Sequence, residues 1–209
     1  MGGIVRPTKS QVRAMSTTIG TLLFTFVSIL IIGPMSDSHV VNRVIAAAIA
    51  GLSIERTMAF SHTLLVKWWA KDLLGEWFYF SNYSVSSHFA HANIYVRGGE
   101  LHYQVDLYEL NEIAAIANGN TIQEAKAVGH AVDRAIFYDG DEVVEILYEV
   151  ERQNHPSGQG VLKVNLNNSK RTMSGYWVTA RDDEGPRSGK MEWYRRPEFL
   201  AFLREQTGE

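Results

Sequence analysis

Cysteine is absent from the 209-residue sequence. Its absence excludes a disulfide framework, a thiol nucleophile and a cysteine-ligated zinc site. The sequence also lacks a hydrolase nucleophile elbow, a phosphate-binding glycine loop and a zinc-protease motif. We therefore predict that the protein is not an enzyme and needs no cofactor.

Acidic residues are scarce in the first third of the chain and abundant in the rest. Before Asp72 there are seven Lys and Arg against two Asp and Glu, and from Asp72 onward thirteen against twenty-one. The acidic part would be repelled by phosphate backbones and by anionic lipid headgroups. Broad nucleic-acid binding is thus excluded for this part, and any nucleotide would need a pocket with locally placed donors.

The segment from Ala14 to Met35 contains no charged residue. As a helix it would reach about 30 Å, the thickness of the hydrocarbon core of a bilayer. We predict one transmembrane helix over about 14–35 and a second over about 44–66. A signal peptide is the alternative for the first, although no Ala-x-Ala cleavage site follows. For the second, the alternative is a span that ends near Ile54, with Glu55 and Arg56 among the headgroups.

The second predicted helix carries small residues at a spacing of four. Ala47, Gly51 and Glu55 lie on one stripe, a pattern that lets helices approach closely in lipid. We predict that these three residues mediate assembly of a homo-oligomer.

Basic residues flank the inner ends of the predicted hairpin. The positive-inside rule therefore places both termini in the cytoplasm. The residues that support this orientation are Arg6, Lys9, Arg13, Lys67 and Lys71, against Arg43 alone on the outside.

From Leu74 onward, apolar and polar residues alternate in short segments separated by turn signals. This pattern predicts eight antiparallel strands joined as a meander. The expected ranges are 74–80, 90–97, 100–108, 128–138, 142–152, 160–166, 173–181 and 188–196.

The only expected interruption of the meander is a short helix within 109–127, where Thr121 and Glu124 form a capping-box pattern. Eight strands of this length close most easily into a small, lipocalin-like barrel, which removes exposed sheet edges. The predicted fold is thus an all-β barrel domain over 72–209 behind an α-helical membrane anchor over 1–71.

Several predicted strand faces combine aromatic rings with arginine. Aromatic rings can stack on bases, and a guanidinium can pair with phosphate. A barrel of this size holds at most one small ligand. We predict that the ligand-binding residues are Tyr79, Tyr95, Arg134, Tyr148 and Trp177, with Tyr148 alternatively a core residue.

Three histidines, His88, His91 and His102, would lie on neighbouring strands. A metal site is conceivable there. Surface histidines near a loop are the favoured interpretation, so no metal is expected.

Two N-terminal membrane helices, a first strand that begins Leu74-Gly75-Glu76-Trp77, and a single eight-stranded barrel resemble the two-transmembrane β-barrel effectors of bacterial anti-phage signalling, found in CBASS operons. The Gly-x-Trp motif is also similar to the lipocalin signature. The effector resemblance implies a barrel that binds a cyclic oligonucleotide made by a partner nucleotide cyclase. It further implies helices that assemble and disrupt the bacterial inner membrane during abortive infection.

Two other functions stay open from the sequence. One is a membrane-tethered barrel that carries a lipid or fatty acid, and the other is a scaffold that recruits protein partners. The arginine-bearing faces favour the effector, since a lipid carrier would need a mostly apolar cavity.

Overall fold

The computed structural model describes residues 9–32, 40–83, 86–119, 127–140, 142–152, 155–181 and 185–207. Contacts divide the chain into two units. The first comprises Met1–Trp69 with Val96–Glu100, and the second comprises Ala70–Tyr95 with Leu101–Glu209.

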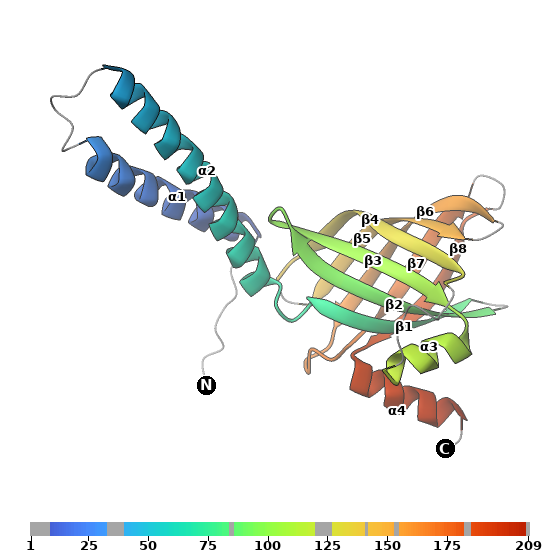
Figure 1. Cartoon of the computed structure of the whole chain (residues 1–209). Coiled ribbons are helices and arrows are strands. Elements are labelled where there is room, and N and C mark those ends of the chain that lie inside the picture. The colour runs from blue at the N-terminus through green and yellow to red at the C-terminus, as the bar shows by residue number, and fades with distance from the viewer. Residues whose placement is uncertain are drawn as a thin grey trace. The chain divides into compact units, whose positions relative to one another are not determined.

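The first unit contains two long helices that pack against each other (Figure 1), α1 (Lys9–Ile32) and α2 (Val40–Trp69). Gly20 allows their close approach, because a Cβ at this position would lie 2.5 Å from Cγ of Met58. Of the predicted oligomerisation stripe, Glu55 is exposed. The side chains of Ala47 and Gly51 lie outside the described residues.

Two helices lie where the membrane hairpin was predicted, but their predicted role as membrane spans is not supported. Within the part of the chain that the structure describes, no helix combines the length and the apolar character needed to cross a membrane.

The second unit is a closed barrel of eight antiparallel strands, in which each strand pairs with the next and β1 pairs with β8 (Figure 1). The predicted all-β meander is therefore confirmed. The strands are β1 (Gly75–Tyr83), β2 (Ser86–Arg97), β3 (Glu100–Tyr108), β4 (Gly129–Tyr138), β5 (Val143–Arg152), β6 (His155–Leu166), β7 (Thr172–Arg181) and β8 (Arg187–Tyr194).

One end of the barrel interior is filled by tryptophan. Trp77 and Trp193 pack edge to face with ring centroids 6.4 Å apart, and the Trp77 indole donates a 2.7 Å hydrogen bond to the carbonyl of Leu73. The Arg195 guanidinium, just after β8, lies 3.7 Å from the centroid of the Trp77 ring. Gly75 of the Gly-x-Trp motif has φ +100°, a conformation that side chains rarely adopt. This end of the barrel is thus closed by packing.

Two helices cover the outer face of β1: α3 (Leu110–Ala117) and α4 (Arg196–Thr207). Phe78 points outward from β1 and stacks on Phe199 of α4 with ring centroids 5.1 Å apart. Arg196 joins the two helices, because its Nη1 donates to the carbonyls of Ile116 and Ala117 at 3.1 and 3.2 Å. The barrel thus has a second apolar core on its outside.

The helix α3 lies where a helical segment was predicted, but the proposed capping box at Thr121 and Glu124 falls outside the described residues. The helix α4 was not predicted. The last strand was expected to continue to Arg196, whereas the structure ends it at Tyr194 and begins α4 at Arg196. Pro197 at the start of α4 explains the change, since proline favours the first turn of a helix and interrupts a strand.

Candidate functional site

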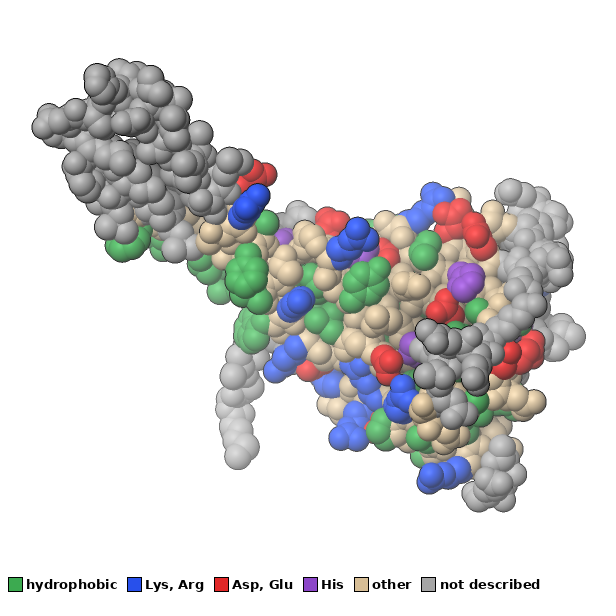
Figure 2. Space-filling view, viewed as in Figure 1, with side chains coloured by type: hydrophobic (Ala, Val, Ile, Leu, Met, Phe, Trp, Pro, Cys, Tyr) green, Lys and Arg blue, Asp and Glu red, His purple; other side chains and the backbone are tan. Residues whose placement is uncertain are grey.

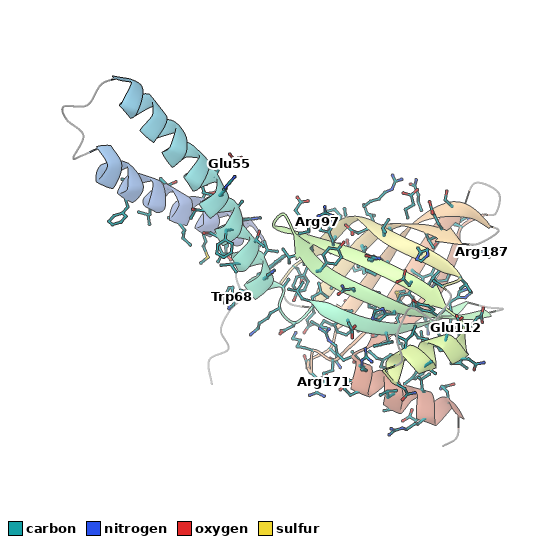
Figure 3. All side chains as sticks on the ribbon, viewed as in Figure 1. Glu55, Trp68, Arg97, Glu112, Arg171 and Arg187 are labelled. Carbon is teal, nitrogen blue, oxygen red and sulfur yellow. The ribbon has the colours of Figure 1, made fainter. Side chains whose placement is uncertain are left out.

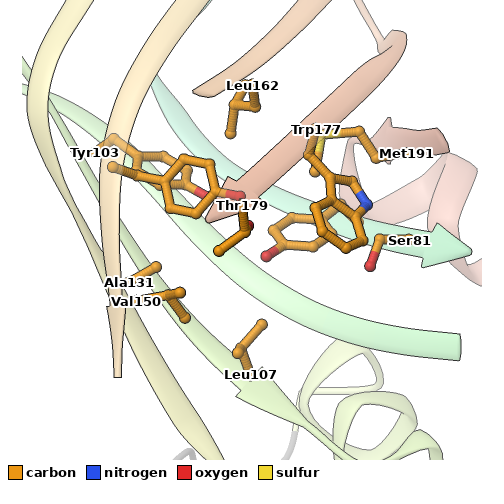
Figure 4. Close-up of a pocket in the computed structure, with 11 residues that line it drawn as sticks. Ser81, Tyr103, Leu107, Ala131, Val150, Leu162, Trp177, Thr179 and Met191 are labelled. Atoms are coloured by element: carbon orange, nitrogen blue, oxygen red, sulfur yellow. The ribbon is translucent and has the colours of Figure 1, made fainter. Parts of the chain in front are cut away.

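The half of the barrel away from the Trp77 and Trp193 core contains a cavity (Figure 4). Its volume is about 50 Å³, which is room for a few water molecules. The lining residues come from all strands except β2. They are Tyr79, Ser81, Tyr103, Leu107, Ala131, Tyr148, Val150, Leu162, Trp177, Thr179 and Met191.

Glycine makes room for the Tyr148 ring on the cavity wall. Gly160 of β6 is the Cα partner of both Tyr148 on β5 and Thr179 on β7. A Cβ on Gly160 would lie 2.5 Å from Cζ of Tyr148. The ring can therefore cross over β6, and its hydroxyl forms a hydrogen bond with the hydroxyl of Thr179.

A glycine also makes room for the Trp177 indole on another part of the cavity wall. Its Cα partner on β8 is Gly189, where a Cβ would lie 2.8 Å from the indole Nε1. The missing side chain lets the indole lie close to β8, and Figure 4 shows it beside Met191 and facing the cavity. Two glycines thus shape the two large aromatic surfaces of the site.

Tyrosine hydroxyls supply much of the polar surface of the cavity. Burial raises the pKa of Tyr103 well above its usual value of 10.0, and the neighbouring Tyr79 and Tyr148 raise this pKa further. The Tyr79 ring stacks on Trp193 with centroids 4.9 Å apart, which fixes its position. A hydrogen bond to Tyr79 also raises this pKa, so the Tyr103 hydroxyl already has a partner on the cavity wall.

None of the described residues that line the cavity carries a formal charge. The nearby carboxylate of Asp133 is already engaged, since it accepts a 2.7 Å hydrogen bond from the backbone N–H of Tyr103 and lies 3.4 Å from Nδ1 of His102. A charged ligand would lose its hydration without gaining an ionic partner from the lining, which is unfavourable. The lining therefore favours an uncharged ligand.

Of the five predicted ligand residues, three line the cavity. Tyr79, Tyr148 and Trp177 come from three different strands and meet there. That they bind a ligand stays a prediction.

Tyr95 was predicted to point inward and does not. Its neighbour Ile94 fills the interior, and Tyr95 lies on the outer face of β2, where its ring stacks on His102 with centroids 5.5 Å apart. The prediction placed the face of β2 that carries Tyr95 inside the barrel, whereas the structure places that face outside.

Arg134 was also predicted to face the cavity, and this placement is wrong. A β-bulge between Asp133 and Ala135 shifts the register of β4 against β5. Arg134 shares the outer face with the exposed Val132, which lies before the bulge; its side chain is 53% exposed, and its Nη2 lies 2.8 Å from Oε2 of Glu149. After the bulge the alternation is reversed, so Ile136 points inward and the predicted common face does not exist.

Several cavity residues were missed. Tyr103 and Leu107 alternate with polar residues along β3, and this pattern could have identified both. Thr179 follows Trp177 on one strand face, although its bond to Tyr148 depends on pairing across β6. The same alternation places Ser81 on one face with Tyr79, and Met191 on one face with Trp193.

The predicted histidine group forms no metal site: among the residues described by the structure, no three potential ligands come together. His91 was expected at the surface but is buried under the outer core, in ring contact with Phe78 at 5.1 Å. Its Nε2 lies 3.5 Å from Oε1 of Glu76. Burial lowers the pKa of His91, and the charge of Glu76 partly opposes this shift.

No family model and no curated protein matches the chain. One solved structure, EF1p2_mFAP2b bound to DFHBI, superposes with a TM-score of 0.40 at 8% identity, over 60% of this chain and 95% of that chain. A superposition at this level carries no argument about this chain. The proposed function therefore rests on the residues of the cavity.

Proposed function

We propose that the barrel binds a small, uncharged molecule with a flat apolar body and one or two hydrogen-bonding atoms. The observation that carries the proposal is the uneven filling of the barrel. One end is packed by Trp77 and Trp193, whereas the other end keeps a cavity walled by Trp177 and the Tyr148–Thr179 pair. Concave sites with apolar walls and a few placed polar groups are typical of ligand pockets.

The polar groups indicate what the ligand must offer. The hydroxyl of Ser81 can donate or accept. The hydroxyls of Tyr103 and Thr179 are bonded to Tyr79 and Tyr148, and each retains lone pairs that can accept a further hydrogen bond. The Trp177 indole provides a flat surface on which a planar ring can stack. A neutral heteroaromatic compound of one ring meets these chemical requirements. A cavity that binds benzene has about 150 Å³, so the cavity of about 50 Å³ must widen to admit such a ring.

The predicted cyclic-nucleotide ligand stays a prediction. Tyr79, Tyr148 and Trp177 offer stacking surfaces, which is the observation in its favour. Arg134, the predicted phosphate partner, lies outside the barrel and no longer supports it. The roles in phage defence, at the inner membrane and with a nucleotide cyclase likewise stay predictions. For a lipid or fatty acid, a cavity of about 50 Å³ would have to expand considerably.

A thermal-shift screen of the full chain tests the proposal. The library contains neutral heteroaromatic compounds, their carboxylated analogues, cyclic dinucleotides and fatty acids. We expect stabilisation by members of the neutral set alone, because binding to the folded state raises the melting temperature. Stabilisation by cyclic dinucleotides or by fatty acids alone would overturn the proposal in favour of the corresponding alternative.

Trp177→Ala provides the site-specific arm of the screen, with Trp68→Ala as the matched control. Trp68 is an exposed tryptophan of α2 and does not line the cavity (Figure 3). Loss of one stacking ring should cost about 1–3 kcal/mol, or roughly 5-fold to 150-fold in Kd. Equal weakening by both substitutions would show that the ligand does not bind at the cavity.

A further inference from the structure

The outer face of β5, β6 and β7 carries a row of exposed aliphatic residues. Leu147, Val161 and Val178 are Cα partners across the three strands, and their exposed fractions are 38%, 44% and 47%. Outward positions of antiparallel strands normally carry polar residues. Such a row is the kind of surface that marks an interaction site.

Aromatic and charged residues form a second row beside the first. Phe137, Glu145, Lys163 and Tyr176 are successive Cα partners from β4 to β7. Glu145 and Lys163 form an ion pair of 2.6 Å, and the two flanking rings are exposed. The helices α3 and α4 pack around Phe78 of β1 and leave these residues uncovered. On the visible face of the barrel, by contrast, charged side chains of both signs are mixed (Figure 2).

We propose that this face pairs with the same face of a second copy, about a two-fold axis that runs along the strands between β5 and β6. Such an axis keeps each residue at its own height and exchanges β5 with β6 and β4 with β7. Leu147 of one copy then meets Val161 of the other, and Glu145 meets Lys163. Phe137 meets Tyr176 in the same way.

Charge selects this axis over the alternative. An axis across the strands would place β5 of one copy against β5 of the other. Glu145 of each copy would then approach Glu149 of the other copy. Like charges brought together at an interface are strongly unfavourable. The axis along the strands instead places a carboxylate against an ammonium twice, as a symmetric dimer requires of a self-complementary surface.

Analytical ultracentrifugation of the full chain tests the pairing. Val161→Glu should convert the dimer to monomer, whereas Leu110→Glu, at an exposed leucine of α3, should leave it dimeric. Circular dichroism checks that both variants fold. A sedimentation coefficient unchanged by Val161→Glu would overturn the proposal and assign any association to other surfaces.

Two charge-reversal variants, Glu145→Lys and Lys163→Glu, give a test whose result cannot be explained by misfolding. Glu145→Lys should be monomeric because the introduced ammonium group would face the Lys163 ammonium group of the second copy. Lys163→Glu should be monomeric because two carboxylates would then face each other. An equimolar mixture of the two variants should dimerise, since every facing pair is then opposite in charge. A mixture that stays monomeric, or single variants that stay dimeric, would contradict the proposed axis.

Discussion

The hydroxyls of Tyr148 and Thr179 are hydrogen-bonded to each other across Gly160, inside the barrel. Both side chains are buried. A buried polar group that loses its partner costs free energy. The pair is therefore both a stabilising contact and a fixed part of the cavity wall.

Tyr148→Phe should lower the free energy of unfolding by about 1 kcal/mol, because the Thr179 hydroxyl loses its partner. Urea unfolding of the full chain measures the change. Tyr95→Phe is the matched control, since Tyr95 lies on the outer face of β2, away from the cavity. Equal stability of the two variants would contradict a structural role for the buried pair.

Arg195→Met should destabilise the barrel by about 2–3 kcal/mol. The guanidinium donates to the carbonyls of Asp72 and Glu76 at 2.7 and 2.9 Å and covers the Trp77 ring, and hydrogen bonds from charged groups contribute more than neutral ones. Denaturant unfolding monitored by tryptophan fluorescence gives the value. A loss below about 0.5 kcal/mol, smaller than one such hydrogen bond contributes, would show that Arg195 is not needed to close this end.

Arg134→Met should have little effect on stability and none on ligand affinity. The Arg134–Glu149 pair is exposed on the outer face, where ion pairs contribute about 0–1 kcal/mol. Calorimetric titration of a screened ligand measures the affinity. A tenfold weaker Kd would show that Arg134 reaches the ligand after all.

The stability of the protein should fall as pH decreases below about 6.5, in a way that depends on His91. Burial lowers the pKa of His91 in the folded state below its usual value of 6.5, so the unfolded chain takes up the proton first. The contribution is complete above pH 6.5 and is lost as pH falls toward the folded pKa. The charged groups that act on His91 are Glu76, Asp106 and Arg196.

Urea unfolding at about pH 7.5 and about pH 5.5, on either side of the usual histidine pKa, measures this dependence. His91→Gln should reduce the difference in stability between the two pH values. Glu76 has a lowered pKa because of its hydrogen bond to Arg196, and its contribution is lost only below about 4.5, outside this interval. An identical pH dependence in His91→Gln and the parent protein would contradict the role of His91.

The strand order could be predicted from the sequence because turn residues separate segments with clear alternation. The orientation of single residues was less predictable. The bulge between Asp133 and Ala135 has no sequence signal, yet it places Arg134 and Ile136 on opposite faces of β4. Along β2, the small apolar residues Ala90 and Ala92 indicate the face that points into the barrel. The prediction instead placed the opposite face, which carries Tyr95, toward the interior.

The cavity inside the barrel could not be predicted from the sequence, because its position and volume depend on which aromatic rings pack against each other. Trp77 and Trp193 fill one end only through the pairing of β1 with β8. The cavity at the other end depends on Gly160 and Gly189, which the sequence shows only as glycines within strands.

The most direct test of the proposed function is to fill the cavity. Ala131 lines it and is buried, so Ala131→Leu should occupy the space of a ligand, whereas Ala180→Leu adds the same atoms to the outer face of β7. Isothermal titration of the best neutral compound from the screen compares both variants with the parent protein. We predict that Ala131→Leu stays folded and loses at least tenfold in affinity, while Ala180→Leu binds like the parent. Unchanged affinity in a folded Ala131→Leu protein would contradict a ligand site inside the barrel.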